Sequence, residues 1–195
     1  MLDIQRIKEC QTQLAYYGKL VAEKGLTYSV FGNISVRLEN GMIIKKRGVN
    51  LELAHPDDFI FVSLTRTPSP SIRNQLSSEW RLHRNCYLVG CKYNAVFHLH
   101  PFYLSLLDEL NIPLECKDME FGYLLKDKIA YLEYLPPGSY KLARNVAGCI
   151  CNYPFLILKG HGIVVAGATV QEVYNLALTA EVIARRIFFK KWFSK

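Results

Sequence analysis

The chain is 195 residues long, half of its residues are hydrophobic and 21% are charged, which excludes a disordered or low-complexity protein. Its 24 Lys and Arg residues outnumber 17 Asp and Glu residues, which gives a net charge of +7. Apart from the run 45–47 and the tail 185–195, the basic residues are dispersed, so we expect no nucleic-acid partner. No apolar run approaches the roughly 20 residues that span a bilayer. We therefore expect a cytoplasmic, soluble protein with no membrane partner, folded as a single domain over residues 1–195.

Helical spacing of apolar residues predicts a first helix over Asp3 to Lys24, which ends at Gly25. Residues 66 to 77 contain two prolines and are the most loop-like segment. Between these segments, Gly, Asn and Pro separate three short runs that are typical of strands: Tyr28 to Arg37, Met42 to Lys46 and Asp58 to Ser63.

The second half of the chain continues the mixed pattern. Ser77 or Ser78 can cap a helix over Glu79 to Tyr87, and a capping box, Thr169-x-x-Glu172, starts the last helix. The other expected elements are a strand over Ala95 to His100, a helix over Phe102 to Leu110, and strands over Phe155 to Lys159 and Ile163 to Ala166. Helices and strands do not alternate as βαβ units, which disfavours a largely parallel, doubly wound sheet.

The six cysteines accompany no secretion signal, so we expect reduced thiols. The pair Cys149-x-Cys151 is too closely spaced for a typical structural zinc site. Burial as small hydrophobic side chains is the better account of most of these cysteines.

Three histidines have a pattern suited to a metal. His98 and His100 lie two residues apart in a predicted strand, so both imidazoles are on one face. His161 lies between two glycines after an apolar strand, where the backbone can turn tightly and a ligand can come close. Together they offer three neutral nitrogen donors and an open position. The alternative is a pair of half-solvated strand histidines and an ordinary turn.

The segment Ser77-Ser78-Glu79 adds two hydroxyls, a carboxylate and free backbone N–H groups at a helix start, which suits an anion such as phosphate. Near a metal, Glu79 could act as ligand, as general base, or as both in turn. An ordinary capped helix is the alternative, and His83 is interpreted as a packing residue.

Two further segments are rich in glycine and hydrogen-bond donors. Gly32 and Gly48 permit close approach of the backbone, and Asn33 and the cations of Lys45-Lys46-Arg47 can hold phosphate oxygens. Each segment taken singly is a weak indication of a binding site.

In this order, the segments resemble the class II aldolase/adducin family, and its fuculose-phosphate aldolase-like branch in particular. The matching stretches are Gly-Asn-Ile-Ser-Val-Arg (32–37), Ser-Ser-Glu-Trp-x-x-His (77–83), Ala-Val-Phe-His-Leu-His-Pro (95–101) and Leu-Lys-Gly-His-Gly-Ile-Val-Val-Ala-Gly (158–167). The resemblance implies an α/β fold of three αβα layers, with a mostly antiparallel central sheet flanked by helices. It also implies a homotetramer with sites at subunit interfaces.

The resemblance implies a divalent metal on His98, His100 and His161, with Glu79 at the fourth position. Zinc is the first choice of metal, and manganese, iron and cobalt are the alternatives. Family aldolases bind the substrate phosphate through residues that match Gly32, Asn33, Ser77 and Ser78 and through a Thr-Gly pair. Here that pair is Arg47-Gly48, so a guanidinium stands where the family has a threonine hydroxyl. A catalytic tyrosine of the family falls near Lys117, which leaves the acid unassigned.

The activity that follows is retro-aldol cleavage of a ketose 1-phosphate through a metal-stabilised enediolate, with Glu79 moving the proton. One alternative is decarboxylation of a sugar-acid phosphate on the same metal site. Another is a non-catalytic, adducin-like interaction module.

Overall fold

A computed structural model describes residues 3–194 of the chain. The strands are β1 (Asn33–Leu38), β2 (Gly41–Lys45), β3 (Phe59–Ser63), β4 (Ala95–Leu99), β5 (Ile129–Leu132), β6 (Phe155–Leu158) and β7 (Gly162–Gly167). The α-helices are α1 (Ile4–Glu23), α2 (Pro70–Gln75), α3 (Trp80–Leu88), α4 (Phe102–Glu109), α5 (Tyr140–Ile150) and α6 (Val170–Phe193). Short helical turns cover Leu51–Leu53, Pro56–Asp58 and Phe121–Leu125.

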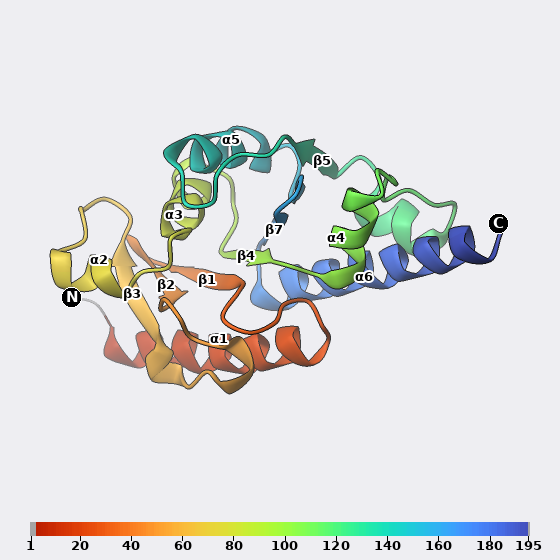
Figure 1. Cartoon of the computed structure of the whole chain (residues 1–195). Helices are drawn as coiled ribbons and strands as arrows, with labels where there is room; N and C mark the ends of the chain where they lie inside the picture. Colours follow the sequence, from red (N-terminus) through yellow and green to blue (C-terminus); the bar gives the residue numbers. More distant parts are fainter. Residues whose placement is uncertain (1–2, 195) are drawn as a thin grey trace.

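The described strands form one seven-stranded sheet in the order β3-β2-β1-β4-β7-β6-β5. Only β5 and β6 run parallel, and the other neighbouring strands of the described sheet pair antiparallel. In Figure 1, α3 and α5 lie above the sheet, and α1 and α6 lie below it. This arrangement confirms the predicted three-layer fold with a mostly antiparallel sheet.

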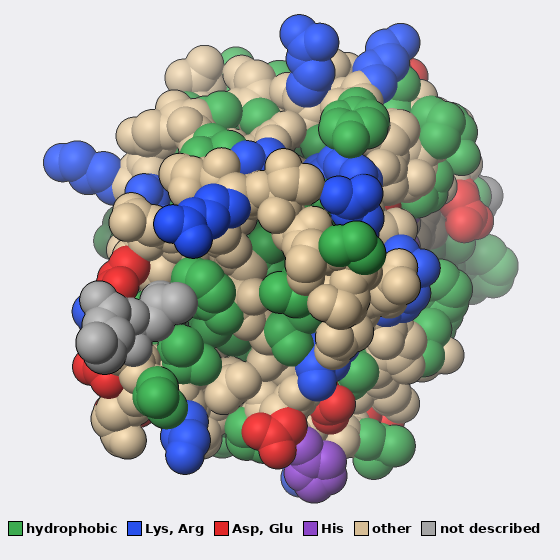
Figure 2. All heavy atoms as spheres, turned by 90° about the vertical axis from the view of Figure 1, so that its left-hand side faces the viewer, with side chains coloured by type: hydrophobic (Ala, Val, Ile, Leu, Met, Phe, Trp, Pro, Cys, Tyr) green, Lys and Arg blue, Asp and Glu red, His purple; other side chains and the backbone are tan. Residues whose placement is uncertain are grey.

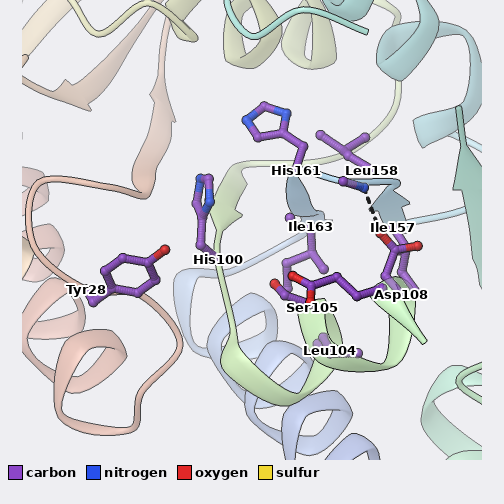
Figure 3. A pocket seen from close by; sticks show the side chains of 12 residues that line it. Tyr28, His100, Leu104, Ser105, Asp108, Ile157, Leu158, His161 and Ile163 are labelled. Atoms are coloured by element: carbon purple, nitrogen blue, oxygen red, sulfur yellow. Dashed lines mark hydrogen bonds between the residues drawn. The ribbon is translucent and has the colours of Figure 1, made fainter. Parts of the chain in front are cut away.

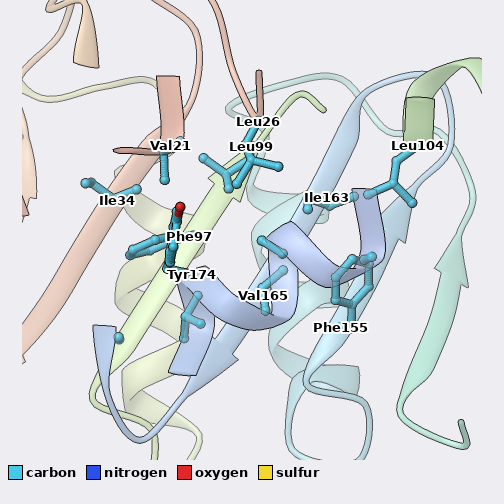
Figure 4. Close-up of a cluster of buried hydrophobic side chains, with 14 of the residues drawn as sticks. Val21, Leu26, Ile34, Phe97, Leu99, Leu104, Phe155, Ile163, Val165 and Tyr174 are labelled. Atoms are coloured by element: carbon cyan, nitrogen blue, oxygen red, sulfur yellow. The ribbon is translucent and has the colours of Figure 1, made fainter. Parts of the chain in front are cut away.

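Alternation along β4 assigns side chains to the two faces of the sheet. Phe97 and Leu99 are fully buried in the cluster formed with α1, α4 and α6, which Figure 4 shows in close-up. Val96 belongs to the second cluster, packed under α3 and α5. Because side chains along a strand alternate between faces, His98 lies on the same face as Val96, toward α3 and α5.

The ends of the long helices follow the predicted capping. The Asp3 side chain accepts hydrogen bonds from the backbone of Gln5 and Arg6, and Gly25 beyond the end of α1 has φ +69°. At α6, the Thr169 hydroxyl accepts from the Glu172 amide at 3.1 Å. None of the helices within residues 3–194 is long and apolar enough to cross a bilayer.

Several boundaries differ from the sequence predictions. The first strand begins at Asn33 because residues 28–32 form the loop that approaches the site, and Pro70–Gln75 in the predicted loop is a short helix with Ser69 as its cap. The third helix begins at Trp80, and neither serine caps it in the usual way. Instead, the Ser77 hydroxyl accepts from the Glu79 amide at 3.2 Å.

The expectation of six reduced thiols is wrong for two of them. Cys91 follows α3 and Cys151 follows α5, and their sulfur atoms form a disulfide with a Cα–Cα distance of 5.6 Å. Helices α3 and α5 pack side by side, so their ends bring the two cysteines within the span that a disulfide bridges. Cys10, Cys86, Cys116 and Cys149 are free.

Basic side chains are scattered over one end of the molecule. Figure 2 shows the face at the α2 and β3 end of the molecule, where Lys and Arg side chains stand separated by hydrophobic and neutral polar groups. This distribution agrees with the dispersed basic residues in the sequence.

Candidate metal centre

Three imidazoles meet at one end of the central strands. His98 and His100 come from the end of β4, and His161 comes from the turn between β6 and β7. Ring centroids are 4.9 Å apart for His98 and His100, 4.7 Å for His98 and His161, and 5.3 Å for His100 and His161. The candidate ligand atoms all lie within 4.8 Å of one another. The structure therefore brings together the three histidines that the sequence predicted.

The tautomer of His98 is set by the strand beside it. Its Nδ1 lies 3.0 Å from the carbonyl oxygen of Ile163, which can only accept a hydrogen bond. Nδ1 therefore carries the proton, and the Nε2 lone pair points inward, 3.2 Å from Nε2 of His100. A backbone carbonyl that orients a metal-ligating histidine in this way is a common feature of metal sites.

The turn that carries His161 depends on its flanking glycines. Gly160 has φ +63°, and its N–H donates to Oδ2 of Asp108 at 2.7 Å, a contact drawn in Figure 3. A Cβ at Gly162 would collide with the Leu99 carbonyl oxygen. Close approach of this turn to β4 therefore requires glycine at position 162 and places the His161 ring beside the other two.

Burial keeps the three imidazoles neutral. It lowers the pKa of His98 well below its usual value, and the neighbouring His100 and His161 lower it further. The pKa of His100 falls to about 4, mainly through burial, with repulsion from His161 and Lys45. Burial also lowers the pKa of His161, whose Nδ1 is buried without a partner within the described chain. Three neutral nitrogen donors with one orphaned atom suit a divalent metal.

The triad forms one wall of a pocket of about 520 Å³. The predicted site residues that line it beside the histidines are Asn33, Arg47, Gly48, Ser77, Ser78 and Glu79. Gly32 is not part of the lining. It has φ +78°, and a Cβ there would meet Oγ1 of Thr27 at 2.6 Å, so it shapes the loop before β1.

Glu79 lies in this pocket but outside the close donor set that the described histidines form. Its side chain is buried, and Oε1 accepts a hydrogen bond from the Gly138 amide at 2.6 Å. Burial raises the pKa of the Glu79 carboxyl, and the Gly138 contact opposes this rise.

Groups suited to an anion line the same pocket, and one of them, Asn33, is paired with His98 across β1 and β4. Oδ1 of Asn33 is buried without a hydrogen-bond partner in the described part of the chain, and the Ser77 side chain is also buried. Arg47 is exposed, and its Nε donates to the Leu76 carbonyl at 2.9 Å, which leaves the two Nη groups for other partners.

The sequence grouped Lys45 with the cations that could hold phosphate oxygens, but it did not indicate the contacts that its ammonium makes within the chain. Its side chain is 1% exposed, and Nζ donates to the carbonyls of Val30 and Val49, both at 2.8 Å. Burial lowers its pKa to about 8. The ammonium therefore ties two loops that border the pocket. The sequence signal for this burial was the position of the lysine directly after the apolar run Met42-Ile43-Ile44, at the edge of the basic segment.

His83 is a packing residue outside the donor set that the described histidines form, as the sequence predicted. It is fully buried, and Nδ1 lies 2.8 Å from the hydroxyl of Ser35.

Residues 12–188 match the family described as Class II Aldolase and Adducin N-terminal domain. This chain belongs to that family. Among its relatives is an L-fuculose phosphate aldolase of Methanococcus maripaludis, 34% identical over 93% of both chains. A 5-methylthioribulose-1-phosphate/5-deoxyribulose-1-phosphate aldolase of Escherichia coli is 27% identical over 93% of this chain and 84% of its own.

A solved structure agrees with the same assignment. The L-fuculose-1-phosphate aldolase of Thermus thermophilus superposes with a TM-score of 0.84 and 26% identity, over 97% of this chain and 96% of that one. The family and these relatives indicate an aldolase-type lyase that depends on a divalent metal.

Proposed function

We propose that this chain cleaves a ketose 1-phosphate of the L-fuculose 1-phosphate kind into dihydroxyacetone phosphate and an aldehyde. One observation carries the proposal: the histidine triad and the groups suited to an anion line a single pocket. The relatives named L-fuculose phosphate aldolase support the choice of substrate class.

His98, His100 and His161 would hold the metal, and three imidazole nitrogens suit zinc. When bound, the metal supplies the positive charge that stabilises the two-oxygen fragment left after cleavage. In the substrate-free site, Glu79 would take the fourth position.

The groups suited to an anion would fix the substrate by its phosphate. Asn33 and Ser77 are buried, so their polar groups are oriented before substrate arrives. This set of groups is completed by Ser78, Arg47 and the backbone at Gly48. Binding energy from the phosphate then holds the bond to be broken in place.

Glu79 would carry the proton. Cleavage breaks the bond between C3 and C4: the C4 hydroxyl gives its hydrogen to solvent or a nearby base as C4 becomes the aldehyde carbon, and the bond electrons remain on C3 of the retained fragment. Glu79 then protonates that carbon. The pKa of Glu79 is raised by burial, which brings the carboxyl closer to the neutral range in which acid–base groups work best.

We also propose a homotetramer with sites at subunit interfaces. Exposed aromatic side chains near the end of α6, Phe189, Trp192 and Phe193, support a contact with another copy.

The test combines metal content with turnover. We expect about one divalent ion per chain after purification without chelator, and loss of that ion in His98→Ala. Glu79→Gln should retain the ion and lose cleavage of L-fuculose 1-phosphate by about 100-fold or more, measured as dihydroxyacetone phosphate released. A wild-type protein that cannot be loaded with any metal would contradict the proposal and favour a non-catalytic interaction module. Unchanged turnover in Glu79→Gln would remove its assigned role.

A further inference from the structure

The three imidazoles of the triad are not held in place in the same way. His98 is oriented by the Ile163 carbonyl, and His161 is placed by the turn between two glycines. The ring of His100 has one polar contact, between its Nε2 and Nε2 of His98 at 3.2 Å, and no hydrogen bond within residues 3–194 involves its Nδ1. The side chain of His100 is also partly exposed. Packing is therefore what remains to orient this ring.

Phe31 supplies that packing. Its ring centroid lies 5.5 Å from the ring centroid of His100, with an angle of 42° between the two planes. Separations of about 4.5–7 Å are typical of attractive contacts between aromatic rings. Phe31 is 49% exposed, lines the pocket of the triad and belongs to neither hydrophobic cluster of the described chain. The core therefore does not account for its position, whereas the contact with His100 does.

The loop that carries Phe31 is fixed by several contacts. Nζ of Lys45 donates to the Val30 carbonyl at 2.8 Å, directly before Phe31. The Phe31 amide donates to the carbonyl of Tyr28 at 3.1 Å, and the Tyr28 ring packs edge-on against Phe31 with centroids 5.4 Å apart. Figure 3 shows Tyr28 facing His100 from this loop. A loop held in this way can keep a neighbouring imidazole in one orientation.

We propose that Phe31 is a positioning residue of the metal site, whose ring holds the imidazole of His100 in the orientation that binds the ion. The inference rests on the proposed function, because it concerns the metal that the triad would hold. A ligand that is oriented before the ion arrives loses less conformational freedom on binding, so the ion binds more tightly. Without the Phe31 ring, the imidazole of His100 gains freedom and the ion binds more weakly.

The test measures metal affinity in the full chain. After removal of bound metal, the dissociation constant for Zn²⁺ is determined by competition with a chromogenic chelator. Phe31→Ala removes the ring and Phe31→Tyr retains it, and neither change opens a cavity in the core because residue 31 is half exposed. Tyr123→Ala is the matched control, since it also truncates an exposed aromatic side chain and Tyr123 does not line the pocket of the triad.

We expect Phe31→Ala to raise the dissociation constant for Zn²⁺ by about tenfold, as loss of a group that orients a metal ligand does. Phe31→Tyr and Tyr123→Ala should keep the wild-type value. The visible absorption of Co²⁺ bound in place of zinc follows the geometry of its ligands, so it should change in Phe31→Ala alone.

The outcomes separate the inference from the proposed function. Equal dissociation constants for the wild type and Phe31→Ala would overturn the inference and leave the proposed function standing. An increase in Phe31→Tyr or Tyr123→Ala as large as that in Phe31→Ala would also overturn it, because the ring at position 31 would then not be the cause. A wild type that binds no divalent ion would instead overturn the proposed function.

Discussion

The buried imidazoles of this chain differ in what faces their ring nitrogens. In the triad, nitrogens of different histidines face one another, as Nε2 of His98 and of His100 do at 3.2 Å. His83 instead meets the Ser35 hydroxyl, which lies 2.7 Å from the hydroxyl of Tyr87. This hydrogen-bonded set of His83, Ser35 and Tyr87 contains no second imidazole that could share a metal. His83 therefore reports on folding, not on metal binding.

The pH dependence of stability follows from His83. Burial lowers its pKa to about 3, whereas an unfolded histidine titrates near about 6.5. On acidification from pH 6.5 toward 3, the unfolded chain takes up a proton that the folded chain does not. Stability is therefore present above pH 6.5 and falls through this window, by about 1.4 kcal/mol per pH unit for one such group.

We expect His83→Gln to show a shallower loss of unfolding free energy between pH 6 and pH 4, with the slope reduced by about one proton. Urea unfolding of the metal-free protein at several pH values measures this slope. His55→Gln is the matched control, because His55 is exposed. A slope in His83→Gln equal to that of the wild type would show that His83 is not protonated on unfolding in this range.

At the scale of elements, the sequence predicted those strands and helices that neighbouring residues mark by alternation or by a cap. Strand β4 was predicted to within one residue because its alternation is strong. The start of α6 was predicted to within one residue because Thr169 and Glu172 mark it. Residues 129–150 were not assigned. There β5 is a four-residue, half-exposed edge strand with little alternation, although α5 carries a visible signal, an apolar face behind the cap at Ser139.

The candidate site likewise contains residues that a local pattern marks and contacts between residues far apart in the sequence. Each histidine of the triad has a local signature, either a two-residue spacing or flanking glycines, and all three were predicted. The partners that hold the site lie far away in the sequence: Gly138 bonds to Glu79, Asp108 to Gly160, and Lys45 to Val30. No local pattern indicates such contacts, because they depend on how α4, α5 and the loops pack.

The disulfide is also a long-range feature, and it predicts a measurable effect. It joins the ends of α3 and α5 across 60 residues of sequence. A cross-link over a loop of this length reduces the entropy of the unfolded chain and stabilises the fold by about 4 kcal/mol. We expect Cys91→Ser/Cys151→Ser to lower the free energy of unfolding by an amount of that order. Dithiothreitol should lower the free energy of unfolding of the wild type but not that of the double variant.

Cys149→Ser is the control for this experiment, because Cys149 is a free thiol two residues from the bridge. It should keep both the wild-type stability and the sensitivity to dithiothreitol. Equal stability of the oxidised wild type and the double serine variant would mean that packing of α3 on α5 already supplies the constraint.

At the scale of the whole molecule, the sheet topology explains why the chemistry gathers at one end. Antiparallel pairing of β1 with β4, and of β4 with β7, places the start of β1, the end of β4 and the start of β7 side by side. The strand ends, and the loops and helices next to them, supply the imidazoles, the groups suited to an anion and the carboxylates. A metal on the triad would connect β4 to the turn between β6 and β7, so it would join the two halves of the sheet.

Such a ligand stabilises the whole fold, because it binds the folded state and finds no assembled triad in the unfolded chain. At a free metal concentration about 100 times Kd, the gain is about 2.7 kcal/mol.

We expect a chelator to lower the unfolding midpoint of the wild type, and added zinc to restore it. The unfolding midpoint of His161→Ala should be the same with and without the metal, because the two remaining imidazoles bind the ion far more weakly than three do. His55→Ala, at an exposed histidine outside the site, should respond as the wild type does. Equal shifts in both variants would place the stabilising ion elsewhere on the molecule.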